Sequence, residues 1–262
     1  MANMNIIANE TYKPLGVNGF PVSTIGLGTV KFGRNTDVKY PKEFLIPDDN
    51  EISTLLKLCI DLGINLIDTA PAYGNSESRI GKLLPGNRDE WYIATKVGEY
   101  YEAGQSHFDF SAKTTQKSIE NSLKNLNTDY VDLVSIHSNG EDESIINETD
   151  IFDILDQLKI KGMVNNIGMS TKTVSGGLKA LEFVDVVMVE LNYEDQGQSE
   201  VIKKAQSLGK GVLIKKALTS GRVADPSTAL HFAANFPGVT SVILGTINPQ
   251  HLRQNVSALT SI

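Results

Sequence analysis

Four side chains that can exchange protons lie at or close after the ends of short apolar runs: Asp68 in NLID, Tyr73 five residues later, Lys96 in WYIATKV and His137 in YVDLVSIH. A buried Lys96 beside Asp68 stays charged, and we expect its field to lower the pKa of a nearby phenol from about 10. Tyr73 then donates a proton near neutral pH to an oxygen that gains negative charge, and His137 orients that oxygen. This chemistry is general acid catalysis on a carbonyl group.

Eight short runs rich in valine and isoleucine supply the elements that position these residues. The runs show no polar alternation, which is typical of strands buried on both faces of a parallel sheet. Right-handed crossovers between such strands favour closure into a (β/α)8 TIM barrel. An open doubly wound sheet is the competing fold, disfavoured because no GxGxxG motif follows the first run. The eight runs are residues 26–30, 65–68, 91–97, 130–137, 164–170, 184–191, 211–216 and 240–245.

Amphipathic segments between the runs predict helices with recognisable starts. Asn50 is the expected N-cap of the first, Ser111 begins another, and Asn248 precedes Pro249 at the first helical position of the last. The turn signal Val-Asn-Gly at 17–19 predicts an N-terminal β-hairpin that closes the bottom of the barrel. Two long irregular segments, 31–48 and 98–110, are candidates for functional loops. The predicted helices are residues 50–62, 111–126, 149–161, 172–182, 197–208, 226–235 and 248–260.

The barrel prediction brings the four proton-exchanging residues to one rim, since chemistry in this fold collects at the carboxyl ends of the strands. Each residue alone also has a structural explanation, as a turn cap, an ion pair, a packed ring or a hydrogen-bonded histidine. Together these explanations weaken, because an apolar barrel mouth does not accept four such groups without pairing them. None of the four is a reductant, so a hydride source is implied. A Schiff-base enzyme that uses Lys96 is an alternative.

Composition narrows the classes of partner. The chain has 262 residues and a net charge of −7, with a pI near 5.2, which argues against nucleic acid or an anionic membrane as partner. The first residues lack the basic-then-apolar pattern of a signal peptide, so we expect none, and no apolar stretch reaches the ~18 residues that span a bilayer. We expect Cys59 to be a core thiol. Residues 1–262 are predicted to form one cytoplasmic domain without a metal site, and no oligomeric state is predicted.

Several blocks of the sequence resemble signatures of the aldo-keto reductase superfamily. They include IDTAPAYGNSESRIG (67–81), IATKVG (93–98) and SLKNLNTDYVDLVSIH (122–137). Further blocks lie near the start (12–29), in the middle (162–170) and near the end (245–258), so the resemblance covers nearly the whole chain in order. It implies a (β/α)8 barrel that transfers hydride from nicotinamide C4 to an aldehyde or ketone. In the family, the tetrad that matches Asp68, Tyr73, Lys96 and His137 is catalytic, with the tyrosine as proton donor.

The resemblance also implies a binding site for NADPH, with NADH not excluded, along the carboxyl rim. Residues near the nicotinamide and pyrophosphate would be Gly28, Thr29 and Lys31, with Asp68 beside them. Ser170 would hydrogen-bond the carboxamide. The remaining contacts carried over by position are Leu218, Ser220 and Gly221 over the pyrophosphate, and Thr246, His251, Gln254 and Asn255 at the adenosine end.

At several positions the chain departs from the family pattern. Met188 stands where many members have a glutamine that holds the carboxamide, and Asn192 is the residue expected to compensate. Lys215 stands where an aromatic side chain often stacks on the nicotinamide. Gly245 and His251 stand where many relatives have a lysine and an arginine for the 2′-phosphate. These departures leave a second function open, that of a sensor or regulatory protein which binds the cofactor with little turnover.

Overall fold

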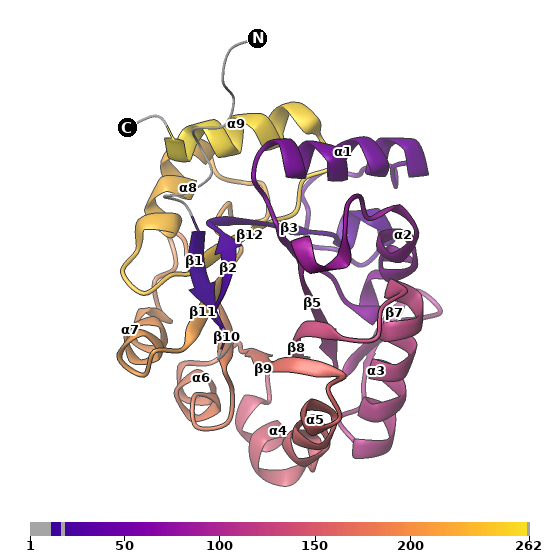
Figure 1. Ribbon diagram of the computed structural model, residues 1–262. Helices are drawn as coiled ribbons and strands as arrows, with labels where there is room; N and C mark the ends of the chain where they lie inside the picture. The colour runs from indigo at the N-terminus through magenta and orange to yellow at the C-terminus, as the bar shows by residue number, and fades with distance from the viewer. Residues whose placement is uncertain (1–11, 17–18, 261–262) are drawn as a thin grey trace.

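In the computed structural model, which describes residues 12–16 and 19–260, eight parallel strands close into a barrel ringed by helices (Figure 1). Around the barrel the strands follow the order β10-β11-β12-β3-β4-β5-β8-β9, and β9 pairs with β10 to close it. Each predicted run overlaps one strand, which confirms the TIM-barrel prediction. A single domain for the whole chain stays a prediction. The strands are β3 (Ile25–Gly28), β4 (Leu66–Asp68), β5 (Tyr92–Val97), β8 (Val131–His137), β9 (Val164–Ser170), β10 (Val186–Glu190), β11 (Gly211–Lys215) and β12 (Ser241–Leu244).

The helices begin close to the predicted positions, with one correction. Asp48, not Asn50, caps the first helix: its carboxylate accepts from the Glu51 amide and the Glu51 side chain accepts from the Asp48 amide, a capping box. Ser111 and Asn248 cap as predicted. The helices are α1 (Asp49–Asp61), α2 (Ser76–Leu83), α3 (Ala112–Leu126), α4 (Asp142–Glu148), α5 (Ile151–Ile160), α6 (Val174–Ala180), α7 (Ser199–Ser207), α8 (Pro226–Asn235) and α9 (Pro249–Thr260).

The segment 98–110, predicted to be irregular, contains a hairpin. Strands β6 (Glu99–Glu102) and β7 (Gln105–Phe108) pair antiparallel across the two-residue turn Ala103-Gly104. Both turn residues have positive φ, of 50° and 84°, as the tight hairpin turns require. Turns of this kind usually have the sequence Asn-Gly or Asp-Gly, because alanine rarely adopts a positive φ. The Ala-Gly pair at 103–104 therefore gave no signal of a hairpin. Helices α2 and α4 were also not predicted.

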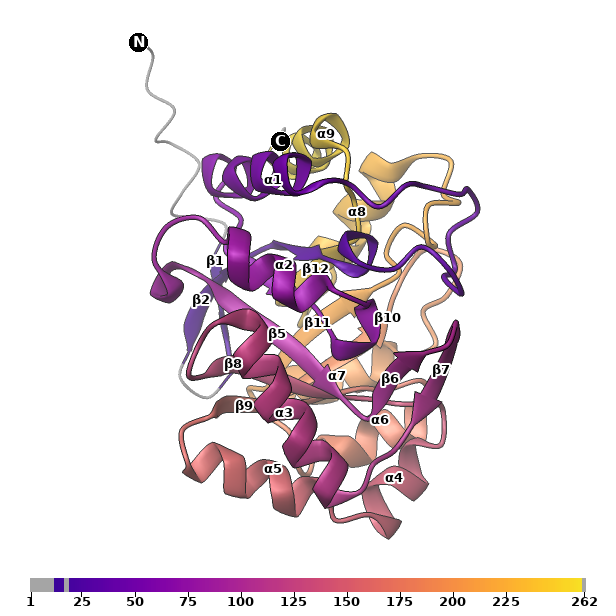
Figure 2. The ribbon, with the colours of Figure 1, turned by 90° about the vertical axis from the view of Figure 1, so that its right-hand side faces the viewer.

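The N-terminal hairpin is confirmed: β1 (Tyr12–Leu15) and β2 (Phe20–Ser23) pair antiparallel. Of its predicted turn, residues 17–18 lie outside the described residues. Leu15 and Val22 are fully buried among side chains that fill the barrel, including Tyr92 and Met188. Figure 2 shows β1–β2 at one end of the barrel and β6–β7 at the other. The hairpin therefore closes the amino end of the barrel and leaves the carboxyl end open for the site.

A second apolar layer holds the helices against the outside of the barrel. Cys59 in α1 belongs to it, and burial raises the pKa of its thiol to about 12, so the expected inert core thiol is confirmed. In the described part of the chain, no helix combines the length and the apolarity that crossing a bilayer requires. The apolar side chains thus stabilise the barrel and its helices, and Asp68, Tyr73, Lys96 and His137 lie at its open carboxyl end.

Candidate active site

A cavity of about 1050 Å³ opens at the carboxyl end of the barrel. Asp68, Tyr73, Lys96 and His137 all line it, so the structure brings the four predicted residues together. A smaller hollow of about 480 Å³, beside α8 and α9, contains none of them. The larger cavity is therefore the candidate active site.

A buried ion pair forms the base of the site. Lys96 Nζ lies 2.6 Å from Asp68 Oδ1 and also donates to the Thr69 carbonyl at 2.8 Å. Burial alone would lower the pKa of Lys96, but its interactions with Asp68 and Tyr73 outweigh that effect, and the net shift is upward. Lys96 is therefore a cation at neutral pH, which disfavours the Schiff-base alternative, because imine formation requires a neutral amine.

Tyr73 lies above this pair at the end of a short 3-10 turn (Pro71–Tyr73). Its ring centroid is 4.9 Å from Lys96 Nζ. Gly74, with φ of 63°, lets the turn pass Gly33 so closely that an added Cβ would lie 2.2 Å from the Gly33 carbonyl oxygen. A side chain at position 74 would therefore move the turn that aims the phenol.

The expected direction of the Tyr73 pKa is corrected by the structure. Burial raises the pKa of the phenol most, Lys96 lowers it and Asp68 raises it again, so the net shift is upward. The field of Lys96 acts in the expected sense, but burial and the opposing charge of Asp68 together outweigh it. Tyr73 consequently remains protonated at neutral pH, which is the form that a proton donor needs.

His137 stands beside Tyr73, with ring centroids 6.2 Å apart and nearly perpendicular planes. Its Nδ1 is buried and lies 2.7 Å from Glu99 Oε2, although the angle between the ring and the carboxylate is not that of a regular hydrogen bond. Burial is the main cause that lowers the pKa of His137, against the opposing effect of Glu99. Burial would raise the pKa of Glu99, but its contacts with His137, Ser106 and Arg34 lower it to about 2. At neutral pH the contact thus joins a carboxylate to a neutral imidazole.

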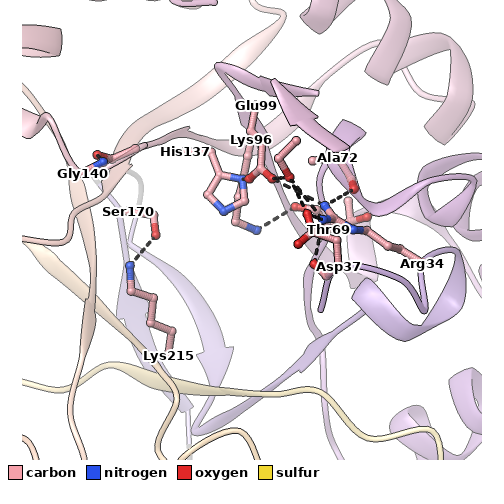
Figure 3. Close-up of polar contacts among 12 residues, drawn as sticks. Arg34, Asp37, Thr69, Ala72, Lys96, Glu99, His137, Gly140, Ser170 and Lys215 are labelled. Carbon is pink, nitrogen blue, oxygen red and sulfur yellow. Dashed lines mark hydrogen bonds and ion pairs between the residues drawn. The ribbon is translucent and has the colours of Figure 1, made fainter. Parts of the chain in front are cut away.

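Arg34 and Glu99 are functional candidates that the sequence did not reveal (Figure 3). Arg34 is 6% exposed and donates to the Ala72 carbonyl at 3.1 Å, next to Tyr73. It also approaches Glu99 Oε1 at 3.5 Å and lies over the Tyr101 ring. The two residues come from the segments 31–48 and 98–110 and meet only because β6–β7 folds back. No local sequence motif predicts the contact between Arg34 and Glu99. The only indication in the sequence is the length of the two segments, which is typical of functional loops.

The residues predicted to bind the cofactor line the same cavity, with one exception. Asn192 is buried outside it, where its Oδ1 accepts from the Glu194 and Asp195 amides at 2.9 Å. Its Nδ2 donates to the Lys216 carbonyl at 3.4 Å, so the side chain ties its own loop to the residue after β11. These contacts lend no support to a role at the carboxamide. The residues that line the cavity are Gly28, Thr29, Lys31, Asp68, Ser170, Leu218, Ser220, Gly221, Thr246, His251, Gln254 and Asn255.

The shape of the cavity wall fits a long ligand that runs from Tyr73 toward α9. An added Cβ on Gly28 would lie 3.0 Å from the Ile243 side chain, so any larger residue at position 28 would crowd this part of the cavity wall. At Gly245 an added Cβ would lie 2.4 Å from the Tyr40 hydroxyl, so a side chain at this position would have to displace the Tyr40 ring. At the start of α9, the amides of Gln250 and His251 donate to the Asn248 side chain. Those two amides are therefore already paired with the Asn248 side chain and are not free to bind a phosphate.

Comparison with known proteins decides the family. The sequence model of the Aldo/keto reductase family matches residues 24–228, which is most of the chain. This chain belongs to the aldo/keto reductase family. The match includes the whole tetrad and ends before β12 and α9, so the predicted adenosine contacts lie outside it.

Curated relatives of this aldo/keto reductase include two enzymes named for sugars. L-Galactose dehydrogenase of Arabidopsis thaliana is 28% identical over 295 residues, with 95% of this chain and 88% of the relative covered. D-Arabinose 1-dehydrogenase of Saccharomyces cerevisiae is 34% identical over 172 residues, with 63% of this chain and 47% of the relative covered. Oxidoreduction of small carbonyl compounds is the chemistry common to the family.

Solved structures agree with the fold. A Pseudomonas aeruginosa protein provisionally named an aldo-keto reductase superposes with a TM-score of 0.88 at 47% identity, with 96% of each chain covered. An aldo-keto reductase of Bacillus halodurans in its holo form superposes with a TM-score of 0.81. At 23% identity, over 95% of this chain and 90% of that one, the second likeness supports the barrel alone.

The rim of this reductase across from Asp68 carries another lysine of the cavity, Lys215. Lys215 Nζ donates to Ser170 Oγ at 2.9 Å (Figure 3). It also donates to the Thr171 carbonyl at 2.8 Å. Burial, together with the charges of Lys216 and Lys172, lowers the pKa of Lys215 to about 7. Met188, beneath it, packs in the barrel interior. The predicted carboxamide partner Ser170 is thus hydrogen-bonded to Lys215.

Proposed function

We propose that this aldo/keto reductase reduces an aldehyde or ketone to an alcohol with NADPH, and that Tyr73 donates the proton. The observation that carries the proposal is the charged Lys96–Asp68 pair directly below the Tyr73 ring, in a cavity that His137 shares. A protonated phenol next to a fixed cation is a suitable donor, because the cation stabilises the phenolate that remains.

The residues of the chain divide the work. Tyr73 and His137 hold the carbonyl oxygen at the open face of the site. As the Tyr73 proton moves to that oxygen, Lys96 stabilises the phenolate, and Asp68 keeps Lys96 charged. A bound nicotinamide supplies the hydride for the carbonyl carbon. Arg34 and Glu99 support the turn before Tyr73 and the ring of His137, respectively.

We propose that the cofactor lies along the rim that runs from Ser170 past β11 and β12. Ser170 would hold the carboxamide, and Leu218, Ser220 and Gly221 would cover the pyrophosphate, since all of them line the cavity. His251 and Gln254 would approach the adenosine end. NADPH is the cofactor expected from the resemblance, and comparison of kcat/KM for NADPH and NADH tests the preference.

We further propose a hydroxylated carbonyl compound of the aldose type as substrate. The cavity wall beside Tyr73 is polar and includes Arg34, Asp37, Glu99 and Ser106, which can exchange hydrogen bonds with several hydroxyl groups. The names of the two curated relatives, both sugar dehydrogenases, support this class. We also propose a single-domain cytoplasmic enzyme, with which the buried thiol of Cys59 is compatible.

Turnover and one variant test the proposal. The protein, mixed with NADPH and a panel of aldoses and activated aromatic aldehydes, should consume the absorbance of the reduced nicotinamide. Tyr73→Phe should lower kcat by about 10²–10⁴-fold, the usual worth of a general acid, and leave the Kd of NADPH nearly unchanged. Wild-type kcat in Tyr73→Phe would refute the proton-donor assignment. Tight NADPH binding with no turnover across the panel would favour the sensor function instead.

A further inference from the structure

Lys215 at the end of β11 has an unusual environment for a lysine inside a cavity. Among the described residues, its Nζ donates to two neutral oxygens, Ser170 Oγ, as Figure 3 shows, and the Thr171 carbonyl. Among residues 12–16 and 19–260, no carboxylate lies within ion-pair distance of this amine. Its charge is therefore directed into the cavity without a counter-ion.

The charged groups around Lys215 come from four packed elements. Lys216, next to it on the chain, and Lys172, after β9, both disfavour its protonation. Glu190 of β10 and Asp142 of α4 favour protonation, but both carboxylates are engaged elsewhere. Glu190 pairs with Lys216, and Asp142 accepts from the Lys172 and Thr173 amides and from the Thr173 hydroxyl. The acids thus only partly offset the repulsion, and the pKa of Lys215 is about 7.

Lys215 lies close to the place that a nicotinamide ring must occupy in order to transfer hydride to a carbonyl group held by Tyr73 and His137. Ser170, which accepts from its amine, pairs in register with His137 on the neighbouring strand. Adjacent strands lie about 5 Å apart. The charge of Lys215 also contributes to lowering the pKa of His137. A nicotinamide that hands hydride to a carbonyl at Tyr73 and His137 must therefore lie within reach of this amine.

We propose that Lys215 distinguishes the redox states of the cofactor, disfavouring the cationic oxidised nicotinamide ring relative to the neutral reduced ring. This inference rests on the proposed function. Oxidised and reduced cofactors carry the same phosphates and differ by one positive charge on the ring, so a nearby ammonium group repels only the oxidised form. In the reductive direction, the same repulsion promotes release of the oxidised product.

The discrimination has a defined pH dependence. Below about pH 7 Lys215 is protonated, and the oxidised cofactor binds against its charge. As the pH rises through that value the amine becomes neutral and the repulsion is lost, so the affinity for NADP⁺ increases. Ionisation of the cofactor phosphates affects both redox states alike and cancels in the ratio of their two Kd values.

The experiment measures the Kd of NADPH and of NADP⁺ at about pH 6 and about pH 8.5 by titration calorimetry, without substrate, in the wild type, Lys215→Met and Lys216→Met. In the wild type, the ratio of the NADP⁺ Kd to the NADPH Kd should fall roughly tenfold between the two pH values. Lys215→Met should show a low ratio that does not change with pH. Lys216→Met is the matched control: it removes a charge that lowers the pKa of Lys215, so the ratio should stay high to a higher pH.

The possible failures are separable. A wild-type ratio that is independent of pH, or equal to that of Lys215→Met, would overturn this inference while leaving the reductase proposal intact. If neither cofactor binds to any of the three proteins, the proposed function itself is wrong, and the inference with it. A loss of pH dependence in Lys216→Met, with Lys215→Met unaffected, would assign the discrimination to the neighbouring lysine and reject Lys215.

Discussion

Lys96 and Lys215 line the same cavity from opposite sides of the rim and differ in their partners. Lys96 is 2.6 Å from Asp68, and its pKa is raised despite burial. Lys215 contacts only a hydroxyl and a carbonyl, and its pKa falls to about 7. The buried Lys96 and the partly buried Lys215 thus show the two possible results of competition between desolvation, which lowers the pKa of a lysine, and charge pairing, which raises it. A paired lysine is a permanent cation, whereas an unpaired one titrates in the physiological range.

The same contrast extends to the two sides of the site. On the side of β4, β5 and β8, each titratable group has a charged neighbour, and Arg34 and Glu99 extend the network to His137. On the side of β9 and β11, the charges of Lys172 and Lys216 disfavour protonation of Lys215, and Glu190 and Asp142 only partly offset them. The titratable groups on the first side therefore keep one protonation state near neutral pH. Lys215 on the second side can change its protonation state in response to the charge of a bound ligand.

The largest expected effect follows from breaking the paired lysine. Lys96→Met leaves Asp68 buried without its cation, which should cost about 3–5 kcal/mol of the free energy of unfolding. It should also lower kcat, because the Tyr73 phenolate loses its stabilising charge. Urea denaturation and steady-state kinetics measure the two quantities.

The control is the double variant Lys96→Met with Asp68→Asn, which removes both charges together. It should recover much of the stability but none of the kcat, because a neutral pair leaves no unpaired buried charge and still cannot stabilise the phenolate. If kcat returned along with the stability, the effect of Lys96 on catalysis would be only structural.

Much of this site was predictable from residue types at strand ends, because a parallel barrel delivers those positions to one rim. Asp68, Lys96 and His137 come directly from β4, β5 and β8, and the barrel order confirms that these strands are neighbours. The pairing of Glu99 with His137 could not be predicted, since it depends on a hairpin whose turn uses Ala103 in a rare conformation. The direction of the Tyr73 pKa also escaped prediction, because it requires the balance of burial, Lys96 and Asp68.

A smaller effect is expected when the network on the paired side loses its outermost acid. Glu99 opposes the burial that lowers the pKa of His137, so Glu99→Gln should lower that pKa further. Titration of the histidine ring signals by NMR measures the shift, and the other three histidines of the chain serve as internal references. Ser106→Ala, which removes a neutral donor to Glu99, is the matched control and should leave the pKa of His137 closer to its wild-type value. An unchanged His137 pKa in Glu99→Gln would mean that the 2.7 Å contact carries no electrostatic coupling.

The smallest effect concerns the free energy of unfolding, which the unpaired charge of Lys215 lowers. In the folded protein the pKa of Lys215 is about 7, below the value of about 10.4 expected for an unfolded chain. Between these two values the unfolded state binds more protons than the folded state, so the wild type gains stability as the pH rises. At or below about pH 7 the full cost of burying the unpaired charge is present. Lys215→Met should then be more stable than the wild type by an amount on the order of 1 kcal/mol, after allowance for partial solvent screening.

Urea denaturation at about pH 6 and about pH 9 tests this linkage. The stability advantage of Lys215→Met should shrink toward the higher pH, where the wild-type amine is neutral in the folded state and no longer needs a counter-ion. Lys96 behaves in the opposite sense, because its raised pKa makes the folded state hold its proton more tightly than the unfolded state does. An advantage of Lys215→Met that stayed constant with pH would show that packing of the methionine, and not removal of an unpaired charge, separates the two lysines.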